Sequence, residues 1–263
     1  MKKDKVKILI LNYNGEKLLK ECLDSVQAID YPNYSVILID NGSSDKSIDY
    51  VKSLYGDSIE IVETGRNRLY AGGYNFFFSK DIEDCYYLIL NNDTIADRGI
   101  LRDFMSGVGE YGQKNIYGCS IMFANEKNKI WYAGAEVNLH KGIIRHRNIR
   151  DDFENIILED CETDYVTGCC MLVHSSIVHQ LGGFDESFKM YMEDVDFCIR
   201  ARSLGVKSYF LRSPRLYHYV SSSVNYKSLK ILSSYIKLSF RQTGLYVLFN
   251  TPILFLRKFL SRS

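Results

Sequence analysis

Residues 1–95 alternate short apolar runs with stretches of helical periodicity, and this alternation constrains the fold more than any other feature. Val6 to Leu11 is a continuous apolar run with β-branched residues, and the helical pattern after it keeps Leu19, Leu23 and Val26 on one face. Strand-like runs recur at 36–39, 59–62 and 86–90, with helical patterns between them. Strands that alternate with helices form mostly parallel sheets covered by helices on both faces. The sequence therefore predicts an α/β fold built on such a sheet.

The strand-like pieces become shorter beyond Ile121. They lie at 130–132, 136–139 and 166–173, and a polar stretch occupies 145–164. A chain of 263 residues buries enough surface to fold without metal or disulfide staples. We predict one domain over residues 1–222, with halves at about 1–120 and 121–222, and a separate tail at 223–263.

Three of the predicted strands end in polar clusters. These clusters are Asn12 to Gly15, Asp40 to Asp45, and Asn91 to Asp93. Ligands of open parallel sheets bind outside the carboxyl ends of the strands, so the clusters are expected to meet at a binding edge. Within the second cluster, Ser43 or Ser44 is expected to cap the following helix.

Asp93 and His218 are the candidate metal ligands. A carboxylate at a strand end suits a hard divalent cation, Mg²⁺ or Mn²⁺, which would share diphosphate oxygens with the protein. The alternative is that Asn92 and Asp93 only form an Asx turn. His218 becomes a ligand only if the fold brings it to Asp93, and otherwise it is an ordinary surface or core histidine.

Other residues near these strand ends offer groups for a nucleotide. Asp40 can accept the imide N–H of uracil or thymine while Tyr13 stacks on the base, although a turn or capping role for Asp40 fits equally well. Gly72 and Gly73 precede a predicted helix, where backbone amides can approach a diphosphate.

The densest carboxylate cluster runs from Asp185 to Asp196 and includes the adjacent Glu193 and Asp194. Both residues precede a helical stretch through Leu204, where acidic side chains favour the positive end of the helix. In a crevice, the same carboxylates would act as a general base that takes the proton of an attacking hydroxyl. The sequence leaves both interpretations open.

The charge of the chain is divided between its ends. Residues 197–263 contain 12 Lys or Arg and no carboxylate, so residues 1–196 carry 21 basic and 32 acidic groups. In the tail, basic residues fall on one side of a helical wheel and apolar residues fall opposite. The apolar set is Leu229, Leu232, Ile236 and Phe240. We predict peripheral membrane contact through residues 226–263. The alternative is that the apolar face packs on the domain or on a second copy in a homo-oligomer.

The apolar run at 245–256 is too short to span a membrane. We expect no signal peptide before Val6, because the first residues are polar and the apolar run after them is short. The seven cysteines are odd in number without Cys-x-x-Cys spacing. We expect a reduced, cytoplasmic chain on the inner face of the membrane, with no nucleic-acid partner.

Taken together, the motifs resemble family 2 glycosyltransferases of the GT-A fold. The resemblance spans roughly residues 5–220, and five motifs occur in the family's order and spacing. They are 11–15 (LNYNG), 40–45 (DNGSSD), 66–75 (RN leading to AGGYN), 90–93 (LNND) and 191–196 (YMEDVD). By this resemblance, residues 1–120 are the nucleotide-binding half, residues 121–222 are the acceptor half, and a basic amphipathic helical tail follows.

The resemblance also implies roles for individual residues. Asp40 corresponds to the base-binding aspartate, Asp93 to the final acid of the metal-binding Asp-x-Asp motif, and Asp194 to the catalytic base, with Glu193 as the second choice. Asn91 replaces the first acid of the Asp-x-Asp motif, and His218 lies where some relatives supply a further metal ligand. The expected substrate-binding residues are Asn12, Tyr13, Asn14, Asp40, Asn67, Gly72, Gly73, Asn75, Asn92, Thr167, Gly168 and Trp131. Trp131 with Tyr132 would form an acceptor platform, or alternatively a buried aromatic pair.

The implied activity is metal-dependent inverting transfer of a sugar from a UDP- or dTDP-sugar donor, with rhamnose as one candidate. The acceptor would be a glycan or a lipid-linked acceptor in cell-surface polysaccharide synthesis. A nucleotidyltransferase is a second hypothesis, but Asn12 to Gly15 lacks the basic Gly-rich loop that it needs. A third is a catalytically inactive subunit that binds sugar nucleotides as a scaffold, which suits Asn91 but leaves Glu193 and Asp194 unexplained.

Overall fold

The computed structural model describes residues 3–220 and 227–244. The strands are β1 (Val6–Asn12), β2 (Tyr34–Asp40), β3 (Glu60–Glu63), β4 (Tyr86–Asn91), β5 (Thr94–Ala96), β6 (Ile116–Phe123), β7 (Glu126–Tyr132), β8 (Ala135–Asn138), β9 (Ile143–His146), β10 (Cys161–Glu162), β11 (Cys170–His174) and β12 (Ser208–His218). The α-helices are α1 (Glu16–Gln27), α2 (Ser47–Tyr55), α3 (Leu69–Phe78), α4 (Ile100–Tyr111), α5 (Ser175–Leu181), α6 (Glu193–Ser203) and α7 (Lys227–Thr243). Short 3₁₀ helices lie at Gly56–Ser58 and Leu139–Lys141.

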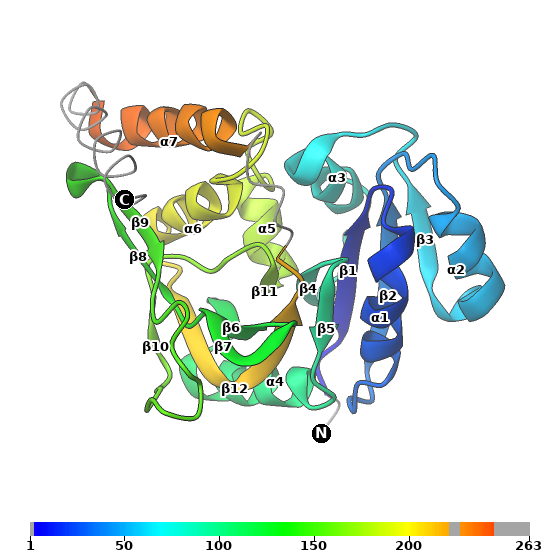
Figure 1. Ribbon diagram of the computed structural model, residues 1–263. Helices are drawn as coiled ribbons and strands as arrows, with labels where there is room; N and C mark the ends of the chain where they lie inside the picture. The colour runs from blue at the N-terminus through cyan, green and yellow to red at the C-terminus, as the bar shows by residue number, and fades with distance from the viewer. Residues whose placement is uncertain (1–2, 221–226, 245–263) are drawn as a thin grey trace.

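Ten strands of the described residues form one sheet in the order β10-β12-β6-β11-β4-β1-β2-β3, with β5 paired to β12 and β7 paired to β6. Strands β4, β1, β2 and β3 are parallel, and Ile8 of β1 stands between Val36 and Leu88. These central strands are apolar on both faces because helices cover the sheet. Figure 1 shows α1 and α2 beside β1 to β3, and α5, α6 and α7 on the other side of the molecule. The predicted α/β architecture is confirmed.

The second half of the sheet is mixed. Strand β11 runs antiparallel to both β4 and β6, while β12 runs parallel to β6. A register shift between Leu211 and Arg215 bends β12, and its last residue, His218, pairs with Thr94 of β5. The long strand β12 therefore carries His218 from the far side of the sheet to the turn after β4.

The basic tail contains the helix α7, which packs on the domain. Tyr235 and Leu238 are buried, whereas Ile236 is 36% and Phe240 56% exposed. The helix turns Tyr235 and Leu238, rather than Ile236 and Phe240, toward the protein, so the alternative in which Ile236 and Phe240 pack on the domain is wrong. Membrane contact through these two residues stays a prediction. Residues 221–226 and 245–263, and the side chain of Leu229, lie outside the described part of the structure. Within the described part, no helix has both the length and the apolar character that a membrane span needs.

Candidate active site

The loops after β1, β2 and β4 are tied together by one buried amide. The side chain of Asn12 is 0% exposed. Its Nδ2 donates to Ser43 Oγ (3.1 Å) and to Ser47 Oγ (3.0 Å), and its Oδ1 accepts from Asn92 Nδ2 (2.9 Å). Asn12 and Asn92 thus satisfy each other, and their first role in this structure is to hold the loops in register.

Asn14 fixes the next turn of the crevice. It adopts a left-handed conformation (φ 52°), which asparagine tolerates better than most residues. Its Oδ1 accepts from the backbone N–H of Ser44 (2.8 Å). The neighbouring Tyr13 is left 49% exposed, with its ring available for stacking.

The predicted cap of α2 is wrong. Ser47 N–H donates to Asp45 Oδ1 (3.1 Å), so an aspartate accepts at this helix start. Ser43 is not available for capping because its hydroxyl accepts from Asn12 and from the N–H of Asn14 (3.0 Å). An aspartate accepts such bonds as readily as a serine. Asp45 takes this role because the Ser43 hydroxyl is already engaged with Asn12 and Asn14.

Asp40 ends β2 and is buried. Its two oxygens accept from the N–H of Ser43 at 3.2 and 3.3 Å, which is the turn interaction that the sequence left open. A carboxylate has about four acceptor positions, so this bond leaves room for a ligand donor. Asn67 is used within the protein, since its Oδ1 accepts from Leu69 N–H (2.8 Å) and from Asn41 Nδ2 (3.2 Å). Sequence reasoning missed Asn41, although its place directly after Asp40 was a signal.

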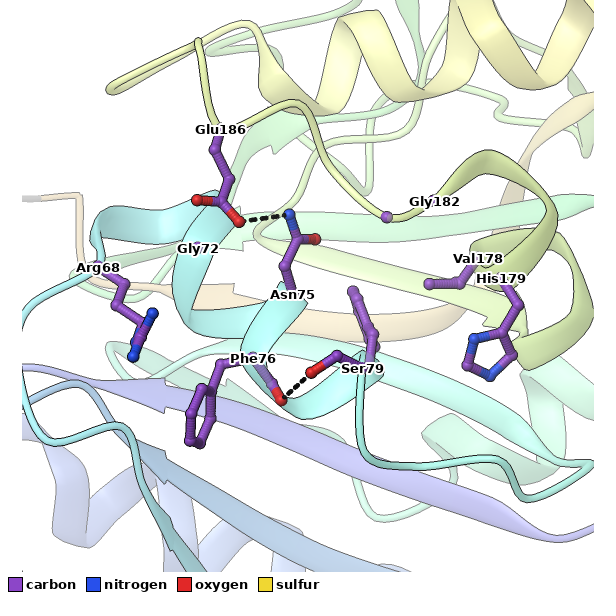
Figure 2. Close-up of a pocket in the computed structure, with 11 residues that line it drawn as sticks. Arg68, Gly72, Asn75, Phe76, Ser79, Val178, His179, Gly182 and Glu186 are labelled. Carbon is purple, nitrogen blue, oxygen red and sulfur yellow. Dashed lines mark hydrogen bonds between the residues drawn. The ribbon is translucent and has the colours of Figure 1, made fainter.

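The two glycines of α3 lie against protein. A Cβ on Gly73 would stand 2.4 Å from Leu11 Cδ1, so this glycine lets the helix pack on β1. Gly72 lines a cavity of about 450 Å³ between α3 and the loop before α6, together with Asn75 and Glu186. Figure 2 shows Asn75 bridging this gap: its Nδ2 donates to Glu186 (3.1 Å) and to the carbonyl of Phe184 (2.8 Å).

Asp93 and His218 come together at the end of β4. His218 Nε2 lies 3.2 Å from Asp93 Oδ1, and the N–H of Tyr219 donates to the Asp93 carbonyl (2.9 Å). Asp93 Oδ1 and His218 Nδ1 are buried and make no hydrogen bond. Buried polar atoms normally find a partner, so an oxygen and an imidazole in this state fit a divalent cation. In the described parts of the chain, no three or more His, Cys, Asp or Glu side chains form a cluster that could hold a metal ion.

Glu193, which is buried, and Asp194, which is half-buried, begin α6. Asp194 accepts from the N–H of Gly168 (2.9 Å) and from that of Val195 (2.8 Å). Glu193 is 7% exposed, and its Oε2 has no hydrogen-bond partner. Burial, and then the charge of Asp194, raise the pKa of Glu193 to about 8. Burial also raises the pKa of Asp194, against the hydrogen bond from Gly168. One proton is therefore retained on the pair at neutral pH.

The turn at Thr167 and Gly168 connects this pair to α3. Tyr70 OH donates to the Gly168 carbonyl (2.6 Å), and a Cβ on Gly168 would stand 2.4 Å from that hydroxyl. The charges of both Asp194 and Glu193 contribute to the raised pKa of Tyr70, after burial. Sequence reasoning missed Tyr70 because nothing in the helical pattern distinguishes it from a core aromatic.

Trp131 packs beside the Asp93–His218 pair. Its ring meets His218 edge to face at 4.6 Å between centroids, and it meets His146 at the same distance. Burial lowers the pKa of His146 to about 4, and its Nδ1 lies 3.0 Å from the Trp131 carbonyl. Tyr132 is buried, while Trp131 remains partly exposed. Trp131 is thus held in place by two histidine rings.

Residues 168 and 169 connect the two carboxylate sites, because the Gly168 N–H donates to Asp194 (2.9 Å). Burial, then the charges of Asp93 and more weakly of Asp194, raise the pKa of the Cys169 thiol. The Cys169 carbonyl accepts from the N–H of Asn91 (3.2 Å), next to the Asp93 turn. The strand-end Asp93 with His218 is therefore connected through residues 168–169 to the pair Glu193–Asp194.

The chain is similar to two curated rhamnosyltransferases. The chain is 25% identical to the rhamnosyltransferase WbbL of Escherichia coli, over 81% of this chain and 83% of that protein. It is also 25% identical to the N-acetylglucosaminyl-diphospho-decaprenol L-rhamnosyltransferase of Mycobacterium tuberculosis, over 92% of this chain and 86% of that protein.

Solved structures give the same fold. GalNAc-T7 with UDP, GalNAc and Mn²⁺ superposes with a TM-score of 0.73 at 13% identity, covering 90% of this chain and 48% of that chain. The mannosyltransferase PcManGT of Pyrobaculum calidifontis, with GDP-Man and Mn²⁺, gives 0.66 at 15% identity, covering 91% and 65%. The family model "Glycosyl transferase family 2" matches residues 7–182, which is more than half of the chain. The chain is thus a glycosyltransferase that belongs to glycosyl transferase family 2 and has the GT-A fold.

Proposed function

We propose that the protein is an inverting glycosyltransferase that moves a sugar from a UDP- or dTDP-sugar to a glycan or lipid-linked acceptor. The observation that carries this proposal is the pair Glu193–Asp194 beside the Thr167–Gly168 turn, which the Cys169 carbonyl connects to Asn91 near Asp93 and His218. Family membership favours this function over a nucleotidyltransferase.

Asp194 is the general base of the proposed reaction. It takes the proton of the acceptor hydroxyl, whose oxygen attacks the anomeric carbon opposite the diphosphate; the bond to the diphosphate breaks as the glycosidic bond forms. Hydrogen bonds from Gly168 and Val195 hold the Asp194 carboxylate in place. Glu193 retains the proton of the pair, which keeps two adjacent negative charges from forming in a buried site. A positioned base contributes about 10²- to 10⁴-fold to the rate.

Asp93 and His218 would hold Mg²⁺ or Mn²⁺, because Asp93 Oδ1 lies 3.2 Å from His218 Nε2 and is buried without a hydrogen bond. The ion would neutralise charge that develops on the departing diphosphate. Two protein ligands suffice where phosphate oxygens complete the shell. Asn91 replaces a carboxylate here, and its backbone carbonyl is already used by Thr94 Oγ1 (2.7 Å).

The nucleotide would lie over β1 and β2. Asp40 has acceptor positions left for the imide of uracil or thymine, and Tyr13 has an exposed ring to stack on the base. The names of two relatives support rhamnose as the sugar, and one of them supports an acceptor on a polyprenyl diphosphate.

We propose peripheral contact with an anionic membrane through α7 and the basic tail. The outward row of α7 carries Ile236 and Phe240, and no carboxylate follows Asp196 in the sequence. An exposed apolar row with neighbouring cations suits a headgroup surface. Such contact would place the enzyme beside a lipid-linked acceptor.

The function is tested by nucleotide release. The full chain is given a panel of UDP- and dTDP-sugars with Mn²⁺ and a polyprenyl-diphosphate GlcNAc acceptor, and released UDP or dTDP is measured. We expect release that depends on one donor and on acceptor, and that stops in excess EDTA. Binding of a donor without turnover under all conditions would instead support the scaffold hypothesis. Undiminished turnover in EDTA would refute the metal.

The membrane contact is tested on α7 itself. Ile236→Ser with Phe240→Ser is expected to abolish sedimentation with anionic vesicles, and Gln242→Ser is the matched control on an exposed site of the same helix. Sedimentation equal to that of the wild type would refute the contact. A change in oligomeric state without a change in sedimentation would show that this face binds a second copy.

A further inference from the structure

The helix α7 contacts the segment that leads into the catalytic pair. This segment, residues 182–192, connects α5 to α6. Ser234 Oγ donates to the Met190 carbonyl (2.9 Å), and Arg241 forms an ion pair with Asp185. The cations of Lys237 and Arg241 lie 5.1 and 5.5 Å from the centroid of the buried Phe188 ring. One helix therefore contacts the segment at its beginning, middle and end.

Arg241 also reaches the buried network behind the segment. It lies 3.5 Å from Asp196 Oδ1, while Asp196 Oδ2 accepts from Arg200 Nε (2.6 Å). Arg200 donates in turn to the carbonyls of Leu181 (3.0 Å) and Gly183 (2.9 Å). An exposed ion pair alone contributes little, but Asp196 is almost fully buried. Its two oxygens are divided between the arginines of α6 and α7.

The end of the segment is strained. Tyr191 (φ 69°) and Met192 (φ 74°) both adopt left-handed conformations, and Glu193 and Asp194 follow directly. Such conformations are strained for non-glycine residues, and they persist only where the surroundings hold them. The contacts from α7 to Met190 and Asp185 are among those surroundings. If these contacts were lost, the backbone before the catalytic pair would be free to relax.

We propose that Arg241 is a positioning residue for the catalytic pair. Through Asp185 and Asp196 it fixes the 182–192 segment and so fixes where Glu193 and Asp194 stand against the Thr167–Gly168 turn. The proposal rests on the proposed function for its catalytic consequence, but the contacts of Arg241 with Asp185 and Asp196 are a property of the fold. It makes α7 part of the catalytic apparatus although Arg241 touches neither Glu193 nor Asp194.

The test compares three full-length variants. Arg241→Gln removes the charge, Arg241→Lys keeps it, and Gln242→Ala alters the neighbouring exposed site. We expect Arg241→Gln to lower kcat about 10- to 100-fold, as for a misplacement of about 1 Å, and to leave the KM for donor within about twofold. Arg241→Lys should recover part of kcat, and Gln242→Ala should match the wild type. Rates are normalised to the fraction of protein that binds nucleotide, which removes effects of unfolding.

Hydrogen exchange provides a second measurement that needs no turnover. Amides of residues 185–192 should exchange faster in Arg241→Gln than in Gln242→Ala, while those of β1 and β4 should not change. Unchanged kcat and unchanged exchange in Arg241→Gln would overturn the proposal, as would a rise in the KM for donor without a fall in kcat. If the wild-type protein transfers no sugar but residues 185–192 still exchange faster in Arg241→Gln, the proposed function is refuted. The role of Arg241 in holding the 182–192 segment would still be supported.

Discussion

The crevice loops after β1, β2 and β4 and the 182–192 segment both carry or precede candidate site residues, but they are held differently. The crevice loops are held by hydrogen bonds to one another. Asn12 bonds to Ser43 and Asn92, and Asn14 bonds to Ser44. The segment is held by side chains from helices outside it. These are Asn75 of α3, Arg200 of α6 and Arg241 of α7.

This difference separates binding from chemistry. Loops that hydrogen-bond to one another form a rigid edge as soon as the parallel strands pair. A rigid edge suits the binding of a nucleotide that is the same in every reaction cycle. A segment held from three helices moves when any of them moves, and it carries the catalytic pair at its end. Mutations in the first region should therefore change stability and donor binding, whereas mutations around the second should change turnover.

The largest effect is expected at Asp194. Asp194→Asn keeps the side-chain volume and removes the base, so kcat should fall by about 10²- to 10⁴-fold while the dissociation constant for the donor stays nearly unchanged. Single-turnover transfer and equilibrium binding of the nucleotide check the two parts. Asp57→Asn, at an exposed site, is the control for the loss of one carboxylate. Transfer by Asp194→Asn at the wild-type rate would show that this residue is not the base.

The sequence predicted which residues end the central strands better than it predicted the contacts between distant elements, for a physical reason. Asp40 and Asp93 lie at strand ends because short apolar runs form the central strands and the following polar residues must turn. His218 reaches Asp93 only through the shifted register of β12, and periodicity does not record a register. The helical wheel of the tail gave the charged and apolar sides, but the wheel cannot show that Tyr235 and Leu238 face the domain.

The second effect tests whether hydrogen bonds between the crevice loops stabilise the fold. Asn12→Ala removes three side-chain hydrogen bonds, which are buried or partly buried, and leaves Asn92 Nδ2 without this acceptor. Unsatisfied buried groups cost about 1–3 kcal/mol each, so unfolding should require roughly 2–4 kcal/mol less free energy. Chemical denaturation measures the loss. Asn75→Ala should behave differently, with a fall in kcat that exceeds any weakening of donor binding. Equal patterns in the two variants would remove the distinction between the regions.

The third effect separates packing from ligand contact at the α3 glycines. Gly73→Ala places a methyl group against Leu11, which should destabilise the protein by about 1–3 kcal/mol even without nucleotide. The control is Gly109→Ala in α4, where nothing lies within 4 Å of the added Cβ. Alanine there should stabilise the helix by roughly 0.5–1 kcal/mol. A Gly73→Ala protein of normal stability that binds donor poorly would indicate instead that this glycine serves the diphosphate.

The smallest effect concerns the pH dependence of stability at Glu193. Its pKa is raised to about 8 by burial and by Asp194, against 4.5 for an ordinary glutamate. Between these values the folded protein binds more protons than the unfolded chain, so this residue's contribution is complete below pH 4.5 and is lost as pH rises through 8. Glu193→Gln cannot titrate and should lack this loss. Relative to the wild type, the variant should therefore become more stable as pH rises from 5 to 9, as measured by urea unfolding at both values. Glu60→Gln, at an exposed site on β3, controls for the loss of one charge.

A difference between Glu193→Gln and wild type that stays constant with pH would show that Glu193 is ionised in the folded state. The shared proton of the pair would then have to be assigned to Asp194, and Asp194 could no longer be the base at neutral pH.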